Sequence, residues 1–143
     1  MRTESKNLEE LKSAVSVAVP RMTRPLETLL SVFFDSPGPI SVPELVQALA
    51  SRRVSVNKVT VYRKLSLLRS LGIIHEVLLS GEKKYYELAR EHHHHLVCLS
   101  CERVTDWMPD ESVLKKEEAC LEREGFLVQY HSLELFGLCR SCK

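Results

Sequence analysis

The sequence predicts an α+β fold of two small domains, and three observations support this prediction. Residues 8–70 carry apolar side chains at helical spacing, and two short strand patterns follow them. Beyond residue 88 the pattern changes to strands around a single helix. Two Cys-x-x-Cys pairs, Cys98/Cys101 and Cys139/Cys142, enclose this second part. A chain of 143 residues is long enough for two such domains.

Four helices are expected in the first domain, over residues 8–19, 23–34, 41–51 and 56–70. Pro20 ends the first helix, and Pro25 fits the first turn of the second. Ser41-Val42-Pro43-Glu44 has the form of a capping box at the start of the third. Ser55 is the expected cap of the fourth helix, which Gly72 ends.

Two strands, Ile73–Leu79 and Lys84–Leu88, are expected to flank a turn at residues 80–83. Helix, turn, helix and β-hairpin in this order form a winged helix-turn-helix. This domain is expected to span residues 1–88, and the second domain residues 89–143. The elements expected in the second domain are strands over Leu96–Leu99, Val104–Trp107 and Phe126–Phe136, and a helix over Ser112–Glu124 ended by Gly125.

Composition and charge narrow the function classes. The hydrophobic content of 44% is typical of a globular protein. No apolar run reaches the roughly 18 residues of a membrane span, and no signal peptide opens the chain, so a cytoplasmic location is expected. Residues 1–90 carry 14 Lys/Arg and 9 Asp/Glu, whereas residues 91–143 carry 6 and 10. A basic first half suits binding to nucleic acid.

The two thiol pairs predict a structural zinc site. A two-residue gap lets both sulfurs of a pair turn toward one ion, and four thiolates suit tetrahedral zinc. In a reducing compartment, paired cysteines favour metal ligation over disulfides. Four buried free cysteines are the alternative. Cys120 has no partner at this spacing, which indicates an ordinary core or surface position.

Four consecutive histidines, His92 to His95, predict further metal sites. Neighbouring side chains of a strand point to opposite faces, so two sites are expected rather than one. The candidates for the first site are His93 and His95, with Glu87 and Asp106 as oxygen donors and His75 from the wing. The candidates for the second are His92, His94 and His131, with Glu111 as an oxygen donor.

The helix over residues 56–70 is the candidate recognition helix. Val61 faces the core, while Thr60, Arg63 and Lys64 share the opposite face. In a DNA complex, basic side chains there would neutralise phosphates, Arg63 would reach guanine edges, and Tyr62 would contact a thymine methyl group. A solvated polar face is the alternative. The candidate DNA-binding residues are Asn57, Lys58, Thr60, Tyr62, Arg63 and Lys64.

These motifs together resemble the ferric uptake regulator (Fur) superfamily over roughly residues 21–142. The matching stretches are Thr60-Val61-Tyr62-Arg63-x-Leu65, Gly72-Ile73-Ile74, the segment from His92 to Cys101, the segment from His131 to Gly137, and the terminal thiol pair. The resemblance implies a dimeric, metal-dependent transcriptional repressor with a winged helix and an α/β dimerisation domain. It implies control of genes for metal homeostasis or peroxide stress through a palindromic operator.

The resemblance also implies three metal sites by matching positions. The structural zinc would take Cys98, Cys101, Cys139 and Cys142. The regulatory site, at the hinge between the domains, would take Glu87, His93, His95 and Asp106. The third site would take His92, His94 and His131. The regulatory ion implied by the resemblance is Fe²⁺, Zn²⁺ or Mn²⁺. One of the three is not selected, because the family cues for these metals conflict in this chain.

Two departures from the family pattern concern the ligands. Where many members place a regulatory-site histidine from the DNA-binding domain, this chain has Pro39, and His75 is the candidate replacement. Where the third site often takes a glutamate from the helix of the second domain, this chain has Leu114. Glu111 is only a neighbour of that position.

Two other functions are compatible with the metal ligands. One is a metal-buffering interaction module with degenerate DNA binding. The other is a metalloenzyme, in which three protein ligands and an open position activate water. The chain lacks a His-Glu-x-x-His motif with its general base, so no enzymatic activity is expected.

Overall fold

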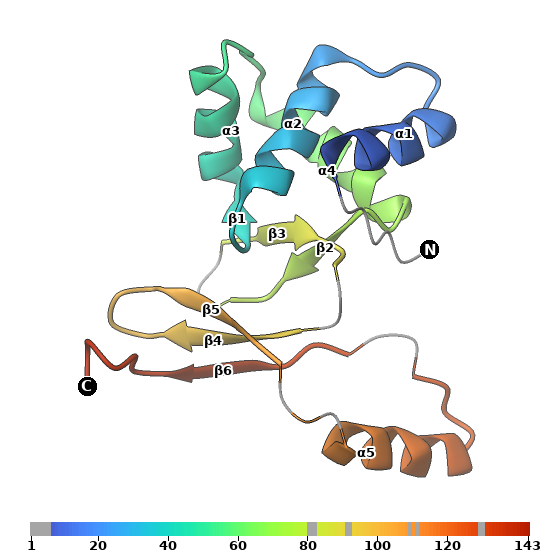
Figure 1. The fold of residues 1–143 in the computed structure, drawn as a ribbon, viewed down its shortest axis with the longest axis vertical. Helices are drawn as coiled ribbons and strands as arrows, with labels where there is room; N and C mark the ends of the chain where they lie inside the picture. Colours follow the sequence, from blue (N-terminus) through green and yellow to red (C-terminus); the bar gives the residue numbers. More distant parts are fainter. Residues whose placement is uncertain (1–6, 80–82, 91–92, 109, 111, 129–130) are drawn as a thin grey trace. The chain divides into compact units, whose positions relative to one another are not determined.

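The computed structural model describes residues 7–79, 83–90, 93–108, 110, 112–128 and 131–143. The chain divides into two compact units, Met1–Glu91 and His92–Lys143. Each unit has its own three-stranded sheet, and the elements are labelled in Figure 1. Among the described residues, no helix combines the length and the apolar character needed to cross a bilayer.

The first unit contains the four expected helices, α1 (Leu8–Ala18), α2 (Arg24–Asp35), α3 (Val42–Ser51) and α4 (Lys58–Ser70). The capping box of α3 is present, because the backbone N–H of Ser41 donates to Glu44 Oε2 at 2.8 Å. The prediction that Ser55 caps α4 was wrong. Asn57 caps this helix, and its Oδ1 accepts from the backbone N–H of Thr60 at 2.8 Å. Asn57 is the last extended residue before the helix and therefore holds the capping position.

The sheet of the first unit has the order β1-β3-β2 and is antiparallel throughout. Its strands are β1 (Ile40–Ser41), β2 (Ile74–Val77) and β3 (Tyr85–Leu88). The hairpin of β2 and β3 is the predicted wing, and its register places His75 opposite Glu87. The short β1 was not predicted. The predicted turn between β2 and β3 falls largely on residues 80–82, outside the described residues.

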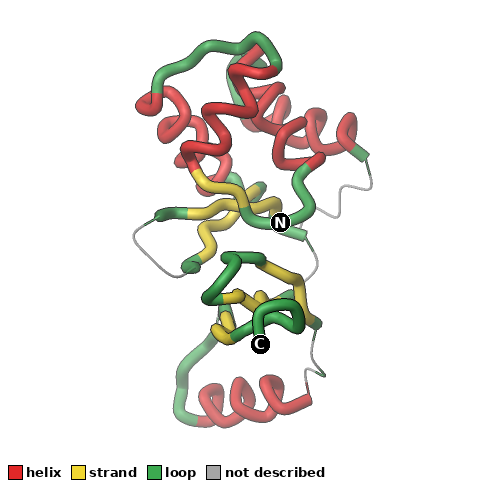
Figure 2. The backbone as a smooth tube through the Cα atoms, turned by 90° about the vertical axis from the view of Figure 1, so that its left-hand side faces the viewer, coloured by secondary structure: helices red, strands yellow, loops and turns green. Residues whose placement is uncertain are grey.

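One hydrophobic core joins the helices of the first unit to its sheet. Figure 2 shows these helices gathered on one side of the strands. Side chains from each helix are at most 2% exposed, among them Val15, Leu30, Leu49 and Leu65. In α4 the buried residues are Val61, Leu65 and Leu68, at the spacing of one helical face. The opposite face of α4 therefore remains available to a ligand.

The second unit is built on β4 (His94–Cys98), which lies between β5 (Val104–Trp107) and β6 (Glu134–Gly137). β5 is antiparallel to β4, and β6 is parallel to it. The helix α5 (Ser112–Arg123) connects β5 to β6 and matches the prediction. The predicted strand over Phe126–Phe136 was too long, because only residues 134–137 pair with β4 and residues 126–128 are irregular.

The second unit has little apolar core of its own. Among the described residues of 92–143, Val97 and Cys98 are the buried apolar side chains. Leu135, Phe136 and Leu138 are about half exposed, at 44%, 46% and 55%. A unit of this size with so few buried side chains requires another source of stability, such as a structural metal or a partner subunit.

Candidate metal centres and nucleic-acid interface

The four paired cysteines meet at one end of the second sheet. β4 ends at Cys98, and a tight turn returns the chain to Cys101. β6 runs parallel to β4 with Gly137 opposite Cys98, so Cys139 follows at the same end. The four sulfurs lie within 4.8 Å of one another. The Sγ atoms of Cys101 and Cys139 are 3.8 Å apart, close to the edge of about 3.8 Å in a tetrahedron with zinc–sulfur bonds of about 2.3 Å.

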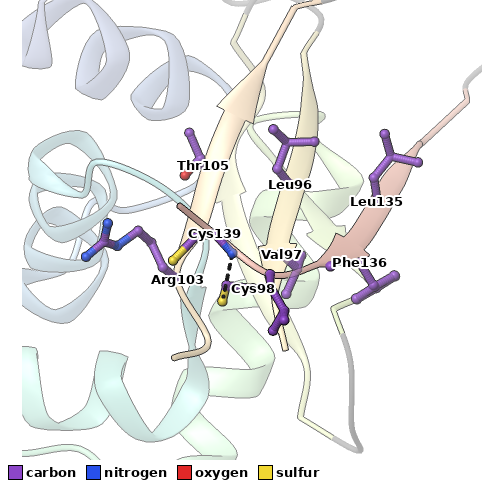
Figure 3. Close-up of a pocket in the computed structure, with 10 residues that line it drawn as sticks. Leu96, Val97, Cys98, Arg103, Thr105, Leu135, Phe136 and Cys139 are labelled. Carbon is purple, nitrogen blue, oxygen red and sulfur yellow. Dashed lines mark hydrogen bonds between the residues drawn. The ribbon is translucent and has the colours of Figure 1, made fainter. Parts of the chain in front are cut away.

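The electrostatics of the cluster favour a bound cation. Backbone N–H groups of Cys101 and Cys139 donate to the sulfur of Cys98 and lower the pKa of this thiol to about 6. Figure 3 shows the bond from Cys139, which spans 3.3 Å. The hydrogen bond with Cys139 raises the pKa of Cys142 to about 11. Cys98 therefore favours the thiolate form, whereas Cys142 keeps its proton. This pattern fits a zinc site, because zinc displaces the remaining protons when it binds.

Cys120 lies apart from this cluster. It is exposed on α5, where the guanidinium of Arg123 donates to its sulfur at 3.3 Å. Of the two positions expected for the fifth cysteine, core or surface, the structure shows the surface one.

His93, His95 and Asp106 form a second cluster of candidate metal ligands. The rings of His93 and His95 are 5.0 Å apart, and register places His95 opposite Asp106. Asp106 Oδ1 lies 4.0 Å from His93 Nε2 and 3.8 Å from His95 Nε2. These distances are too long for hydrogen bonds and leave space for an ion with ligand distances of about 2.0–2.2 Å.

Glu87 and His75 belong to the wing of the first unit. They face each other across β2 and β3, and His75 Nε2 donates to Glu87 Oε1 over 2.7 Å. Glu87 is buried, with 6% of its surface exposed. A buried carboxylate requires a hydrogen-bond donor or a metal ion, and His75 is one such donor in the first unit.

His94 points to the other side of β4, as the alternation of a strand requires. Its ring stacks on His131 with the centroids 5.4 Å apart. His131 Nδ1 lies 2.8 Å from Glu118 Oε1 on α5. The structure therefore brings together two of the histidines predicted for the third site. The other two candidates, His92 and Glu111, lie outside the described residues.

Sequence reasoning missed Glu118. It follows Leu114, the position at which the family resemblance led us to expect a glutamate, by one helical turn. Residues four apart share a face of a helix. This spacing was the available signal, and it makes Glu118 a better candidate for an oxygen donor than Glu111.

The candidate recognition helix α4 presents a polar face. Lys58, Tyr62 and Arg63 are exposed, and Thr60 and Lys64 are partly exposed. The amide of Asn57 is engaged in the helix cap, which limits its role at bases. A basic, exposed face at the start of the second helix of a helix-turn-helix suits the major groove of DNA.

The fold and these ligand clusters define a class of protein, a metal-binding winged-helix regulator. The model of the family described as "Ferric uptake regulator family" matches residues 18–136. The chain belongs to this family. Its members are dimeric DNA-binding transcriptional regulators rather than enzymes.

Individual relatives agree with this assignment. The ferric uptake regulation protein of Synechococcus elongatus is 34% identical over 137 residues, covering 93% of this chain and 92% of the relative. The peroxide-responsive repressor PerR of Staphylococcus epidermidis is 23% identical over 136 residues, covering 95% and 90%. The structure of the ferric uptake regulator of Helicobacter pylori superposes with a TM-score of 0.82 at 21% identity, covering 98% of this chain and 96% of that one. This last likeness concerns the fold.

Proposed function

We propose that this protein is a homodimeric repressor that binds a palindromic operator when a regulatory divalent metal is bound. The observation that carries the proposal is the ligand group of His93, His95 and Asp106 on the second sheet. We further propose that it acts in the cytoplasm on genes of metal homeostasis. Peroxide-stress genes are the alternative, since a PerR protein is among the relatives.

The regulatory site couples metal binding to DNA binding. Glu87, on the last strand of the winged helix, precedes His93 by only six residues. We assign Glu87, His93, His95 and Asp106 as ligands, with His75 as a fifth ligand or as the donor that orients Glu87. Ligands from both units favour one relative arrangement of the units. The population of that arrangement rises according to the difference in metal affinity between the two states.

The chemistry of these ligands limits the regulatory ion to a few divalent metals but does not select one of them. Imidazole nitrogens and carboxylate oxygens suit Fe²⁺, Zn²⁺ and Mn²⁺, whereas the four thiolates suit zinc. When bound at the regulatory site, the ion supplies positive charge that holds the carboxylates and imidazoles together. The structural zinc of the four cysteines is a separate ion with a separate role.

The recognition helix supplies the contacts to DNA. Lys58, Arg63 and Lys64 carry the charge that neutralises phosphates, and Arg63 and Tyr62 contact base edges. Most of the affinity comes from phosphate contacts and decreases with salt. Two copies of the helix, related by the symmetry of a dimer, require an operator with matching half-sites.

The second sheet supplies the dimer contact. One face of the sheet carries Leu96 of β4 and Leu135 of β6, which lie opposite each other in the register and are exposed by 37% and 44%. A hollow of about 270 Å³ lies among them (Figure 3). Apolar patches of this kind mark protein interfaces. The occupant we propose is the same surface of a second copy, because the family is dimeric.

A metal titration tests the proposed function. Protein that retains its structural zinc but is stripped of other metals is mixed with labelled promoter fragments, and Mn²⁺, Fe²⁺ or Zn²⁺ is added in turn. Anisotropy should report selective binding that saturates with at least one ion. His95→Ala should abolish the response and leave the dimer intact, whereas Lys116→Ala on α5 should change neither.

The same DNA-binding measurement distinguishes metal-homeostasis genes from peroxide-stress genes as targets. Selective binding that is lost after hydrogen peroxide treatment would favour the peroxide-stress genes. If fully metallated protein shows no preference for any promoter fragment over random DNA, the proposed function is wrong.

A further inference from the structure

Arg53 holds a backbone conformation that residues with a side chain rarely adopt, with φ of 59°. It lies in the turn between α3 and α4, directly after the C-cap residue Arg52. The backbone N–H groups of Arg53 and Val54 donate to carbonyls three and five residues back, both at 2.9 Å. This pattern is a Schellman motif, in which the left-handed position usually carries glycine.

Two other helices of this chain end in the same motif, and both use glycine. Gly72 ends α4 with φ of 67°, and Gly125 ends α5 with φ of 79°. Their backbone hydrogen bonds have the same spacing and lengths of 2.9–3.0 Å. Glycine adopts this conformation without the steric cost of a Cβ atom. The backbone of the helix-turn-helix turn therefore favours glycine at position 53, and the arginine requires a different explanation.

The side chain of Arg53 is available for a ligand. It is exposed, and within the described residues it makes no hydrogen bond or ion pair. Its neighbour Arg52 differs, since its guanidinium pairs with Asp35 at 2.7 Å. The charge of Arg53 is thus uncompensated in the turn, whereas that of Arg52 is balanced by an acidic partner.

The position of Arg53 relative to α4 indicates which ligand it meets. Asn57, the cap of the recognition helix, follows four residues later. In a helix-turn-helix the first residues of the recognition helix enter the major groove. The turn in front of them then lies beside the sugar–phosphate backbone at the rim of the groove.

We propose that Arg53 contacts a phosphate of the operator and that this contact is the reason for an arginine in a left-handed turn. The inference rests on the proposed function, because it requires that the chain binds DNA through α4. It adds a residue outside the recognition helix to the interface. A guanidinium suits this role because its planar fork of donors binds phosphate oxygens in pairs.

Arg53→Gly tests the proposal with two readouts, the melting temperature and the affinity for DNA. If Arg53 had only a structural role, the two would change together. The protein is loaded with the ion that gives selective binding in the metal titration. The probe is a short labelled duplex that the wild-type protein selects from random sequence. The variant should melt at the same temperature or higher, because glycine suits the turn. Its affinity should fall about fivefold or more, and the slope of log K against log salt should decrease by about 0.9 for each arm of the dimer.

Two controls accompany the variant. Arg53→Lys keeps the charge and should recover most of the salt slope. Lys116→Ala removes an exposed charge from α5 and should alter neither affinity nor slope. An unchanged affinity for Arg53→Gly would overturn the proposal. So would a weaker affinity with an unchanged salt slope, because the loss would then not come from a phosphate contact. If the wild-type protein selects no duplex at all, the proposed function fails together with this inference.

Discussion

The backbone N–H of Cys139 donates a hydrogen bond to the sulfur of Cys98 over 3.3 Å, although 41 positions separate the two residues. The parallel pairing of β6 with β4 makes this contact possible, because it brings the ends of both strands to one edge. The donated bond stabilises the thiolate form of Cys98. The first thiol pair and the last are thus joined by the backbone as well as by the ion that we assign to them.

Loss of the zinc site should unfold the second unit and spare the first. Cys98→Ser removes a thiolate ligand, and the few buried apolar side chains of residues 92–143 cannot replace the metal. Circular dichroism and hydrogen exchange should show loss of protection in the second sheet and retention of α1 to α4. Cys120→Ser is the matched control, and it should keep one zinc and the wild-type transition. A zinc-free Cys98→Ser protein that unfolds cooperatively as a dimer would contradict this prediction.

Glu118 should contribute to metal binding at the third site. Its carboxylate lies 2.8 Å from His131, whereas the adjacent Glu117 is exposed on α5. In a His95→Ala background, which removes the regulatory site, Glu118→Ala should lower the remaining metal affinity by about 10–100-fold. Competition titration with a chromophoric chelator measures this affinity. Glu117→Ala should have no effect, and equal affinities for the two variants would exclude Glu118 as a ligand or orienting group.

His75 should tune the regulatory site through Glu87. The hydrogen bond of 2.7 Å between them orients the carboxylate. His75→Ala should weaken binding of the regulatory metal by about tenfold, the lower range for groups that orient a ligand. A loss as large as that of His95→Ala would instead make His75 a direct ligand. Isothermal titration of both variants with Mn²⁺ separates the two roles, and wild-type affinity in His75→Ala would rule out both.

The dimer should depend on the apolar face of the second sheet. Leu135 is 44% exposed on β6, and Leu135→Asp would place a charge in the proposed contact. We expect monomers by sedimentation velocity at micromolar concentration. Val17→Asp is the matched control, because Val17 is an apolar residue of α1 with 88% exposure. A dimeric Leu135→Asp protein would refute this interface, and a monomeric Val17→Asp protein would show that the effect is not specific.

The sequence predicted the elements whose signals are local. Apolar spacing and a capping box fix α3, and the spacing of Val61, Leu65 and Leu68 fixes the buried face of α4. Residues close together in the chain supply these signals, so they can be read directly from the sequence. The cap of α4 was misplaced because Ser55 and Asn57 are both good capping residues, and only the backbone conformation decides between them.

Features that depend on distant partners were not predictable in the same way. The extent of β6 depends on where β4 offers hydrogen-bonding groups, so the apolar residues 126–128 were assigned to a strand that does not form there. The contact of Glu118 with His131 depends on the path between α5 and β6. The left-handed backbone of Arg53 was also missed, because the usual signal for such a turn is glycine.

The order of the elements along the chain has a consequence for synthesis on the ribosome. All strands of the first sheet are complete at Leu88, whereas the second sheet needs β6 and its zinc cluster needs Cys142. Domains tend to fold as units while translation proceeds. The unit that we propose to bind DNA can therefore fold first, whereas the unit that we propose to control this binding can assemble only after Cys142 has left the exit tunnel.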